Sequence, residues 1–359
     1  MDRHDLSEEV TAEHVARLHQ EDLKVQDKFN CRALTYWFDD QRKTAFCLVE
    51  APDVESVHRM HDHAHGEVPH SIIEVDAGLV ESFLGRIEDP GPFSGIELNI
   101  IDEPAFRFLL SVHIGYRPLE DMKITGLAST VKSYKIRVIA HINDLGGTVV
   151  RQDGRYLLAS FTSALQAVEC GLAVVESLGN LYPHLSISLG LDACIPVAGS
   201  KSMFEDTIRT SRRLCETRKG FSVSSVVLAM YQEENTDTCQ NGNKIATFDA
   251  AELIFLHKLL DYLELNFPRA EMSIDYLASS LGLSRSQLFR NAVNLLNCAP
   301  NAFLNKFRLE KSLDILSSGL NSVSETAFLC GFSSSSYFSK CFHKMYGIAP
   351  KEYNLAMHV

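Results

Sequence analysis

One stretch of the chain occurs twice near its C-terminal end, and it limits the possible folds more than any other feature. Residues 272–289 (MSIDYLASSLGLSRSQLF) align with residues 321–338 (NSVSETAFLCGFSSSSYF) without a gap, at a constant offset of 49. The alignment superposes Ala278 on Ala327, Gly282 on Gly331, Ser284 on Ser333 and Phe289 on Phe338. A small residue lets two helices approach, glycine takes the positive φ of a tight turn, and serine caps the next helix. The repeat predicts two helix-turn-helix units.

Further positions after the second copy have a specific spacing. Phe342, Gly347, Pro350 and Tyr353 follow Ala327 and Gly331 at fixed distances along the chain. With these positions, residues 248–359 resemble the AraC/XylS family of transcription regulators. The resemblance implies two helix-turn-helix subdomains joined by a rigid helix, which we expect at residues 301–316. It also implies that the two recognition helices enter successive major-groove segments of double-stranded DNA, about one helical turn apart.

Helix periodicity selects the side chains that such recognition helices would expose. Counted from the serine caps, this periodicity predicts that Leu288 points inward in the first helix. In the second helix it predicts that Tyr337, Phe338 and Phe342 point inward. We expect base contacts from Arg285, Ser286, Gln287, Phe289, Arg290, Ser335, Ser336, Ser339 and Lys340. Arg290 suits bidentate recognition of guanine and Gln287 that of adenine. Because the alignment superposes both on serines, we expect the first helix to supply most of the specificity.

Phosphate contacts are expected from four basic residues of the same region, namely Lys306, Arg308, Lys311 and Lys344. The alternative for each is a solvated surface position. The chain carries a net charge of −12, yet from Asp249 onward ten Lys/Arg balance ten Asp/Glu. The charge of this region therefore gives only weak support for DNA binding. The prediction of DNA binding depends on the fold.

Composition narrows the class of protein. The nine cysteines are scattered and never spaced as Cys-x-x-Cys, so they indicate neither a disulfide framework nor a zinc ribbon, and we expect reduced core residues. The sequence has no apolar run of membrane-spanning length, and its first residues do not resemble a signal peptide. We expect a cytoplasmic protein with no membrane partner.

The first 90 residues have the pattern of a ferredoxin-like α+β domain. Strand-like and helix-like segments alternate in the order β-α-β-β-α-β, over residues 1–5, 11–29, 31–38, 44–50, 52–65 and 71–75. The first strand is short, because only Met1 to Asp5 are available for it.

Eight of the fourteen histidines lie within the first 70 residues. His58, His61 and His65 are spaced i, i+3, i+7 and share one helix face. His19 lies on the inward stripe of the preceding helix, and a ferredoxin-like sheet would bring it and His4 near that face. Imidazoles one turn apart can share a borderline divalent metal such as nickel, zinc or copper. The alternative is surface or hydrogen-bonded histidines.

Several short segments of this domain resemble a small nickel-binding family of ferredoxin-like domains. They are Arg3-His4-Asp5, residues 19–26 (HQEDLKVQ), Tyr36-Trp37, residues 46–52 and His61-x-x-x-His65-Gly66. The resemblance implies a bound divalent metal, nickel first, as the cofactor.

Residues 91–230 have the pattern of a second α/β domain, similar to the class III nucleotidyl cyclase homology domain. The similarity rests on Gly146-Gly147, Asp153-Gly154, residues 158–161 and Arg212-Arg213-Leu214 before Lys219-Gly220. Two-metal phosphoryl chemistry needs carboxylates. Val112 and Arg155 occupy the two positions where the resemblance implies metal-binding aspartates, Arg209 replaces a ribose-orienting asparagine, and only Arg213 matches a functional position.

These patterns together predict a multidomain protein, α/β in its first two domains and all-α in the last. The expected limits are 1–90 for a metal-binding domain, 91–230 for a cyclase-like domain that forms a homodimer, 231–247 for a linker and 248–359 for the double helix-turn-helix. We expect a DNA-binding regulator, responsive to a divalent metal, and no enzyme. The rivals are a nucleotidyl cyclase with a DNA-binding tail, and a ligand-independent regulator whose N-terminal domains are scaffolds.

Overall fold

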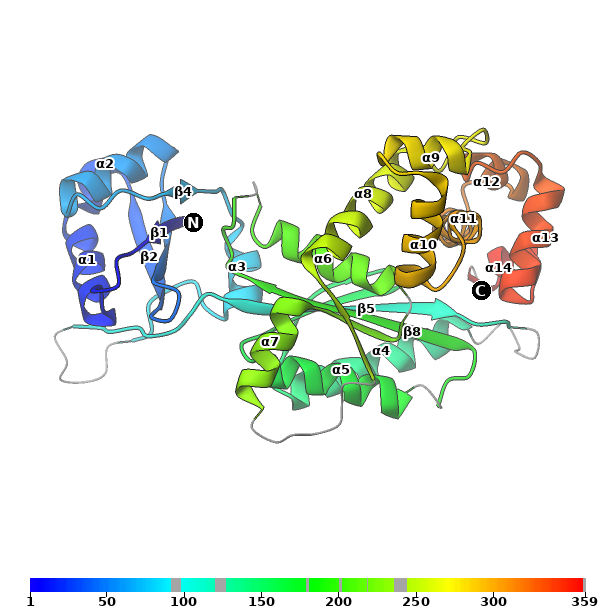
Figure 1. Cartoon of the computed structure of the whole chain (residues 1–359). Helices are drawn as coiled ribbons and strands as arrows, with labels where there is room; N and C mark the ends of the chain where they lie inside the picture. Colours follow the sequence, from blue (N-terminus) through cyan, green and yellow to red (C-terminus); the bar gives the residue numbers. More distant parts are fainter. Residues whose placement is uncertain are drawn as a thin grey trace. The chain divides into compact units, whose positions relative to one another are not determined.

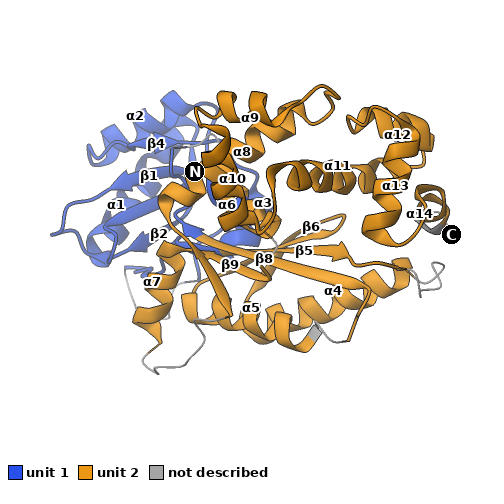
Figure 2. Ribbon diagram, turned by 45° about the vertical axis from the view of Figure 1, so that its right-hand side comes forward, with its two compact units in different colours: residues 1–108, 193–208 blue, residues 109–192, 209–359 orange. Residues whose placement is uncertain are grey.

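The computed structural model describes residues 1–91, 98–119, 127–178, 181–199, 202–217, 219–235 and 244–357 (Figure 1). It divides into two compact units, which Figure 2 distinguishes by colour. The first unit comprises residues 1–108 and 193–208, and the second comprises residues 109–192 and 209–359. The domain limits expected near residues 90, 230 and 247 remain predictions, and residues 92–97 and 236–243 lie outside the described residues.

The first unit contains an antiparallel sheet of the predicted ferredoxin-like topology. Its strands have the order β2-β3-β1-β4. The elements along the chain are β1 Asp2–Asp5, α1 Ala12–Val25, a 3-10 turn Gln26–Phe29, β2 Arg32–Asp39, β3 Thr44–Glu50, α2 Val54–Ala64 and β4 Ser71–Ile72. This order confirms the β-α-β-β-α-β pattern, including the short first strand.

Caps and apolar stripes explain the two helices that cover this sheet. The side chain of Thr11 accepts a hydrogen bond from the His14 backbone and begins α1, and Asp53 begins α2 in the same way. Their buried faces contain apolar residues together with His19, Asp22 and His61. A further helix, α3 Ala77–Leu84, was not expected from the sequence.

The second sheet has six strands in the order β10-β9-β8-β5-β7-β6. The elements are β5 Arg107–Tyr116, α4 Leu127–Asp144, β6 Thr148–Asp153, β7 Tyr156–Phe161, α5 Ala164–Leu178, β8 Leu185–Cys194, α6 Glu205–Glu216, β9 Phe221–Ser224, α7 Ser225–Glu234 and β10 Ile245–Phe248. The expected linker 231–247 is shorter than predicted, because its described residues include the end of α7 and three residues of β10. β10 pairs in parallel with β9.

Two glycines show how closely helices pack on the two faces of this sheet. A Cβ atom at Gly190 in β8 would lie 1.9 Å from the carbonyl oxygen of Ser211 in α6. A Cβ atom at Gly171 in α5 would lie 2.4 Å from the ring of Phe221 in β9. Gly190 pairs with Ser222 and so lies on the same face of the sheet as that residue. Phe221 precedes Ser222 in β9 and points to the opposite face, so α6 and α5 pack on opposite faces of the sheet. Figure 1 shows α4, α5 and α7 on the same face.

Seven helices form the C-terminal module, as the repeat predicted. They are α8 Ala250–Asn266, α9 Ile274–Ser280, α10 Arg285–Leu296, α11 Pro300–Ser317, α12 Val323–Leu329, α13 Ser335–Tyr346 and α14 Pro350–Met357. Four of these helices, α8, α9, α10 and α12, are capped by the side chains of Asp249, Ser273, Ser284 and Ser322. The long helix α11 lies between the two helix-turn-helix units (Figure 1).

The turn of the second helix-turn-helix is one residue longer than the gap-free alignment predicts. The cap of α13 is Ser334 rather than Ser333. Before the turn, the buried Ala278 and Ala327 are 49 residues apart, whereas after it the buried Leu288 and Phe338 are 50 apart. Phe332 N–H bonds to the carbonyl oxygen of Ala327 as Leu283 N–H bonds to that of Ala278, so the added residue lies between Phe332 and the cap. The constant offset of 49 is therefore wrong beyond the turn.

The two turn glycines differ in their surroundings, and this gives a matched pair of variants. Gly282 and Gly331 have φ of +68° and +77°, so an alanine at either position costs roughly 1–2 kcal/mol of backbone strain. A Cβ atom at Gly331 would also lie 2.1 Å from the carbonyl oxygen of Phe267, whereas nothing lies within 4 Å at Gly282. We expect Gly331→Ala to lower the thermal unfolding midpoint more than Gly282→Ala. Equal shifts would contradict the close approach.

Candidate metal centre and nucleic-acid interface

Strands β1 and β3 and helices α1 and α2 surround a small cavity in the first unit, which both polar and apolar side chains line. Its volume is about 20 Å³, slightly more than one water molecule needs. The polar residues lining it are His4 from β1, His19 and Asp22 from α1, Cys47 from β3, His61 from α2, and His65 and Glu67 after α2. The cavity therefore gathers imidazole, carboxylate and thiol groups around a space for one small ion or water.

Three donor atoms in this cavity form a triangle of nearly equal sides. The Oδ1 atom of Asp22 lies 3.1 Å from Nδ1 of His61 and 3.3 Å from Nε2 of His65, and the two nitrogens are 3.4 Å apart. A tetrahedral ion with bonds of 2.0–2.1 Å separates its ligands by about 3.3 Å. Asp22 Oδ1 forms no hydrogen bond among the described residues. The spacing of these three donor atoms fits a bound divalent cation.

Asp2 holds His61 in the orientation that such a site requires. Its Oδ2 atom lies 3.2 Å from Nε2 of His61, so the ring nitrogen opposite the triangle has a carboxylate partner. Its Oδ1 atom accepts a hydrogen bond of 3.1 Å from the backbone N–H of Cys47. A carboxylate behind a ligating imidazole fixes the tautomer and the ring orientation at metal sites.

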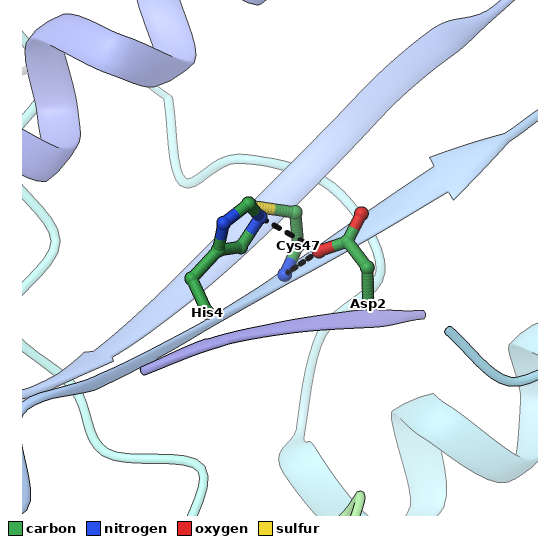
Figure 3. A group of neighbouring side chains, drawn as sticks. All are labelled: Asp2, His4 and Cys47. Atoms are coloured by element: carbon green, nitrogen blue, oxygen red, sulfur yellow. Dashed lines mark hydrogen bonds and ion pairs between the residues drawn. The ribbon is translucent and has the colours of Figure 1, made fainter. Parts of the chain in front are cut away.

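A second group adjoins the first through the same aspartate. Asp2, His4 and Cys47 have donor atoms within 4.8 Å of one another, and Figure 3 shows the imidazole and the thiol side by side. Nε2 of His4 lies 3.4 Å from Asp2 Oδ1 but forms no hydrogen bond among the described residues. Asp2 and Cys47 are direct partners in the pairing of β1 with β3. Mixed nitrogen, oxygen and sulfur donors suit borderline metals such as nickel, zinc and copper.

The charges of this cavity are strongly coupled. Burial would lower the pKa of His61, but the carboxylates of Asp2 and Asp22 raise it to about 10. Burial would raise the pKa of Asp2, but the neighbouring imidazoles of His4 and His61 hold it well below its usual range. Without a metal, His61 is therefore protonated at neutral pH, and a cation bound at Nδ1 would take the place of that proton.

The histidines predicted as ligands are only partly brought together. His4, His61 and His65 belong to the two groups. His19 lines the cavity, but its Nε2 atom lies 3.1 Å from Asp89 Oδ2. His58 belongs to neither group, because it is almost one helical turn of about 5.4 Å before His61 and does not line the cavity. The predicted ladder therefore reduces to its last two members.

Sequence reasoning missed three donors, Asp2, Asp22 and Cys47. Two of them had a readable signal. Asp2 precedes His4 by two residues and so lies on the same face of the strand. Asp22 follows His19 by three residues on the inward stripe of α1. Cys47 had none, because only the register between β1 and β3 brings it to Asp2.

In the second unit, the first recognition helix, α10, exposes the side chains predicted to read bases. Arg285, Ser286, Gln287, Phe289 and Arg290 are all exposed, whereas Leu288 is buried as predicted. Phe289 is 52% exposed, more than expected. Gln287 has a structural role, because its Oε1 atom accepts a hydrogen bond of 2.8 Å from the Ser284 backbone N–H in a capping box. Its amide nitrogen and the second lone pair of Oε1 are left for adenine.

The second recognition helix, α13, presents a different face from the predicted one. Because α13 begins at Ser335, Tyr337 points outward and is 48% exposed, although it was expected to pack inward. Ser336 and Lys340 are exposed, and Ser335 and Ser339 are half-buried. Lys340 follows its cap by six residues, as Arg290 follows Ser284. The residue equivalent to Arg290 is therefore Lys340 and not Ser339.

The four expected phosphate contacts differ in their surroundings. Arg308 is buried and donates to the carbonyl oxygens of Phe267 and Arg269 at 3.0 and 2.7 Å, so its prediction as a phosphate contact is wrong. Its guanidinium instead ties α11 to the loop after α8. Lys344 is exposed, Lys306 is half-buried, and the Lys311 ammonium lies 5.1 Å from the centre of the Phe307 ring.

Comparison with known proteins identifies both ends of the chain. Residues 1–75 match the family model "Nickel responsive protein SCO4226-like", and residues 277–355 match the model "Helix-turn-helix domain". The HTH-type transcriptional regulator MtrA of Neisseria gonorrhoeae is 30% identical over 36% of this chain and 41% of its own length. The HTH-type transcriptional regulator GbdR of Pseudomonas aeruginosa is 33% identical over 27% of this chain and 26% of its own length.

An adenylate/guanylate cyclase/hydrolase from Silicibacter pomeroyi is 19% identical over 37% of this chain and 83% of that chain, with a TM-score of 0.31. No helix of the described residues is both long and apolar enough to cross a membrane. This chain spans less than half the length of the two curated regulators named above. The C-terminal module is nevertheless a helix-turn-helix domain of the AraC type, as the repeat predicted, and residues 1–75 are similar to the nickel-responsive family.

Proposed function

We propose that the chain is a sequence-specific, DNA-binding transcription regulator of the AraC/XylS type. The observation that carries the proposal is the equivalence of Arg290 and Lys340. Each is exposed six residues after the serine cap of the second helix in a helix-turn-helix, and each is free to face a groove. A regulator that reads two half-sites of double-stranded DNA needs such a pair.

The surroundings of both helices support this use. Ser284 and Ser334 begin α10 and α13, and the exposed N-terminal turns would offer backbone N–H groups and a positive dipole end to phosphates. The region from Asp249 onward has no net charge, so its general electrostatic attraction to DNA would be weak. Affinity would therefore depend on base contacts and on a few phosphate contacts such as Lys344.

The test is a selection of duplexes from a randomised library by the full-length protein, followed by binding measurements at several salt concentrations. We expect a consensus with two half-sites about 10 base pairs apart. Affinity for the consensus should exceed that for scrambled duplexes by at least about a thousandfold. A library that yields no consensus, or binding that is equal for both duplexes, would remove the proposal.

We further propose that the first unit binds a divalent metal, nickel first, and that this binding is the signal. Asp22, His61 and His65 would hold the ion, and Asp2 would orient His61. A bound cation would supply positive charge between two buried carboxylates and bridge α1 to the end of α2. Since the triangle joins two helices that otherwise meet through protonated His61, the domain should be more stable with metal than without it.

Two residues of the middle domain indicate that it lacks the metal ligands of a cyclase. Val112 is fully buried in β5, and the Arg155 side chain is paired with Glu310 in α11. Neither residue can ligate a metal at the two positions where the resemblance to cyclases implies aspartates. We therefore propose that the chain is not an enzyme, and we expect no cyclic nucleotide from ATP or GTP with Mg²⁺ or Mn²⁺.

Two other features of the regulator also remain proposals. Homodimers would place two copies of the DNA-binding module on one operator, each copy reading its own pair of half-sites, and light scattering of the full-length protein measures that state. A DNA-binding role implies location in the cytoplasm. The rival in which residues 1–230 are a scaffold predicts that neither metals nor nucleotides change the stability of the chain.

A further inference from the structure

The second unit holds its DNA-binding module at three separate places. The cyclase-like sheet and the seven helices of the module belong to this same compact unit. One contact involves the first helix-turn-helix, one involves the long helix α11, and one involves the second helix-turn-helix. Together they connect a single rigid sheet to both halves of the module.

The contact with α11 is a buried ion pair. Arg155 lies in the turn between β6 and β7, where its own carbonyl oxygen accepts a hydrogen bond of 2.9 Å from Ile114 N–H in β5. Its Nη1 atom lies 2.7 Å from Glu310 Oε2, and its Nη2 atom lies 3.3 Å from Asp314 Oδ1. The side chains of Arg155 and Glu310 are only 11% and 10% exposed. A short bond between buried charges fixes the position of α11 against the sheet.

The first helix-turn-helix is fastened through α6 and β10. Arg213 in α6 donates to His257 Nδ1 at 2.7 Å and pairs with Asp261, both in α8. Leu214 and Phe248 belong to the same apolar core as the buried leucines of α8 and α10. Lys219 Nζ also donates to the carbonyl oxygen of Asn294, near the end of α10.

The second helix-turn-helix is fastened at the far end of β5. The backbone N–H of Leu119 donates to the carbonyl oxygen of Tyr346, the last residue of α13, at 2.8 Å. The rings of Tyr116 and Tyr353 meet edge to face with their centres 5.9 Å apart. Both recognition helices are thus held near their C-terminal ends, whereas Arg290 and Lys340 remain exposed.

We propose that Arg155 is a positioning residue for DNA binding, which holds α11 against the cyclase-like sheet and so fixes the spacing and angle between α10 and α13. This inference rests on the proposed DNA-binding function. A body attached to both halves and to the helix between them prevents the halves from bending independently. Such a protein binds two half-sites at only one spacing. Binding at another spacing would deform the protein or the DNA, and this deformation costs free energy.

The experiment compares three duplexes with the full-length protein: the selected site, the same site with five base pairs inserted between its halves, and a single half-site. Arg155→Glu places a carboxylate against Glu310 and Asp314. We expect it to lower affinity for the selected site about tenfold, in the range of couplings between contacting residues, to leave the single half-site unchanged and to reduce the penalty of the insertion. Arg155→Glu with Glu310→Arg reverses the pair and should restore the spacing preference.

Arg151→Glu is the matched control, because Arg151 is exposed in the adjacent strand β6. Glu310→Gln keeps the shape of the buried side chain, so it tests the same point if Arg155→Glu does not fold. Folded variants with the wild-type spacing preference would overturn the inference, and so would equal losses on the single half-site and the full site. Failure of the wild-type protein to select any site would instead remove the proposed function.

Discussion

Substitution of both His61 and His65 by alanine is expected to weaken Ni²⁺ binding by more than about a hundredfold, since it removes two donors and not only an outer partner. Of the triangle, only Asp22 Oδ1 would remain. Calorimetric titration of the full-length protein with Ni²⁺, Zn²⁺ and Cu²⁺ measures the loss. Wild-type protein should also gain about 2.7 kcal/mol of stability at a free metal concentration one hundred times Kd, and a chelator should remove that gain.

His58→Ala with His63→Ala is the matched control for this result. Both residues lie in α2 beside the ligands, but neither belongs to the groups of donors. The control removes the same number of imidazoles and should bind metal as the wild type does. Asp22→Asn keeps the shape of the third donor and removes its charge, so it should weaken binding in a folded protein. Equal loss in the control, or full binding by the double variant, would show that the metal is held elsewhere.

The metal centre shows what spacing along a helix can and cannot predict. The interval between His61 and His65 indicates one shared face, and both rings are in the cavity. The same argument included His58, because periodicity gives the direction of a side chain but not how far along the helix the site lies. Asp2 and Cys47 come together only through the pairing of β1 with β3. A single sequence does not contain that register, since strand partners are chosen by the packing of the whole sheet.

The predicted start of the second recognition helix was wrong by one residue, and the reason is local. Residues 333–336 are four consecutive serines, and each of them is a good helix cap. The gap-free alignment selects Ser333, but the burial of Phe338, which follows Ser334 by four residues as Leu288 follows Ser284, decides for Ser334. Propensity could not separate these choices, because the deciding term is apolar burial in the folded module.

Arg155 illustrates a different limit. The resemblance to cyclases implies that Arg155 replaces a metal-binding carboxylate, and this much was predicted from the turn that contains it. Its partner Glu310 is 155 residues away along the chain, in the C-terminal module of the same unit. No periodicity or motif connects two such positions. The sequence therefore predicted what Arg155 cannot do, and only the folded chain indicates what it does instead.

Replacement of Arg290 by alanine is expected to cost about 1–3 kcal/mol of DNA-binding free energy on duplexes that carry the preferred base pair at one position of the first half-site. The loss should vanish on duplexes altered at that base pair, because a bidentate contact to guanine is then already absent. Since Lys340 occupies the same position after its cap in α13, Lys340→Ala should relax the preference at one position of the second half-site. Both recognition helices would then contribute to specificity. The gap-free alignment, which places serines in the second helix, had predicted that the first helix supplies most of it.

Lys351→Ala provides the control, because Lys351 is exposed in α14 and is not part of a recognition helix. It should leave the sequence preference unchanged. Binding of the three variants to a panel of single-substitution duplexes distinguishes base contacts from phosphate contacts. If Arg290→Ala weakened binding to all duplexes equally and reduced the salt dependence by about one counterion, Arg290 would contact phosphate. The first recognition helix would then have lost its strongest reader, and discrimination would fall to Lys340 and Tyr337, the exposed pair that the longer turn brings to the surface of α13.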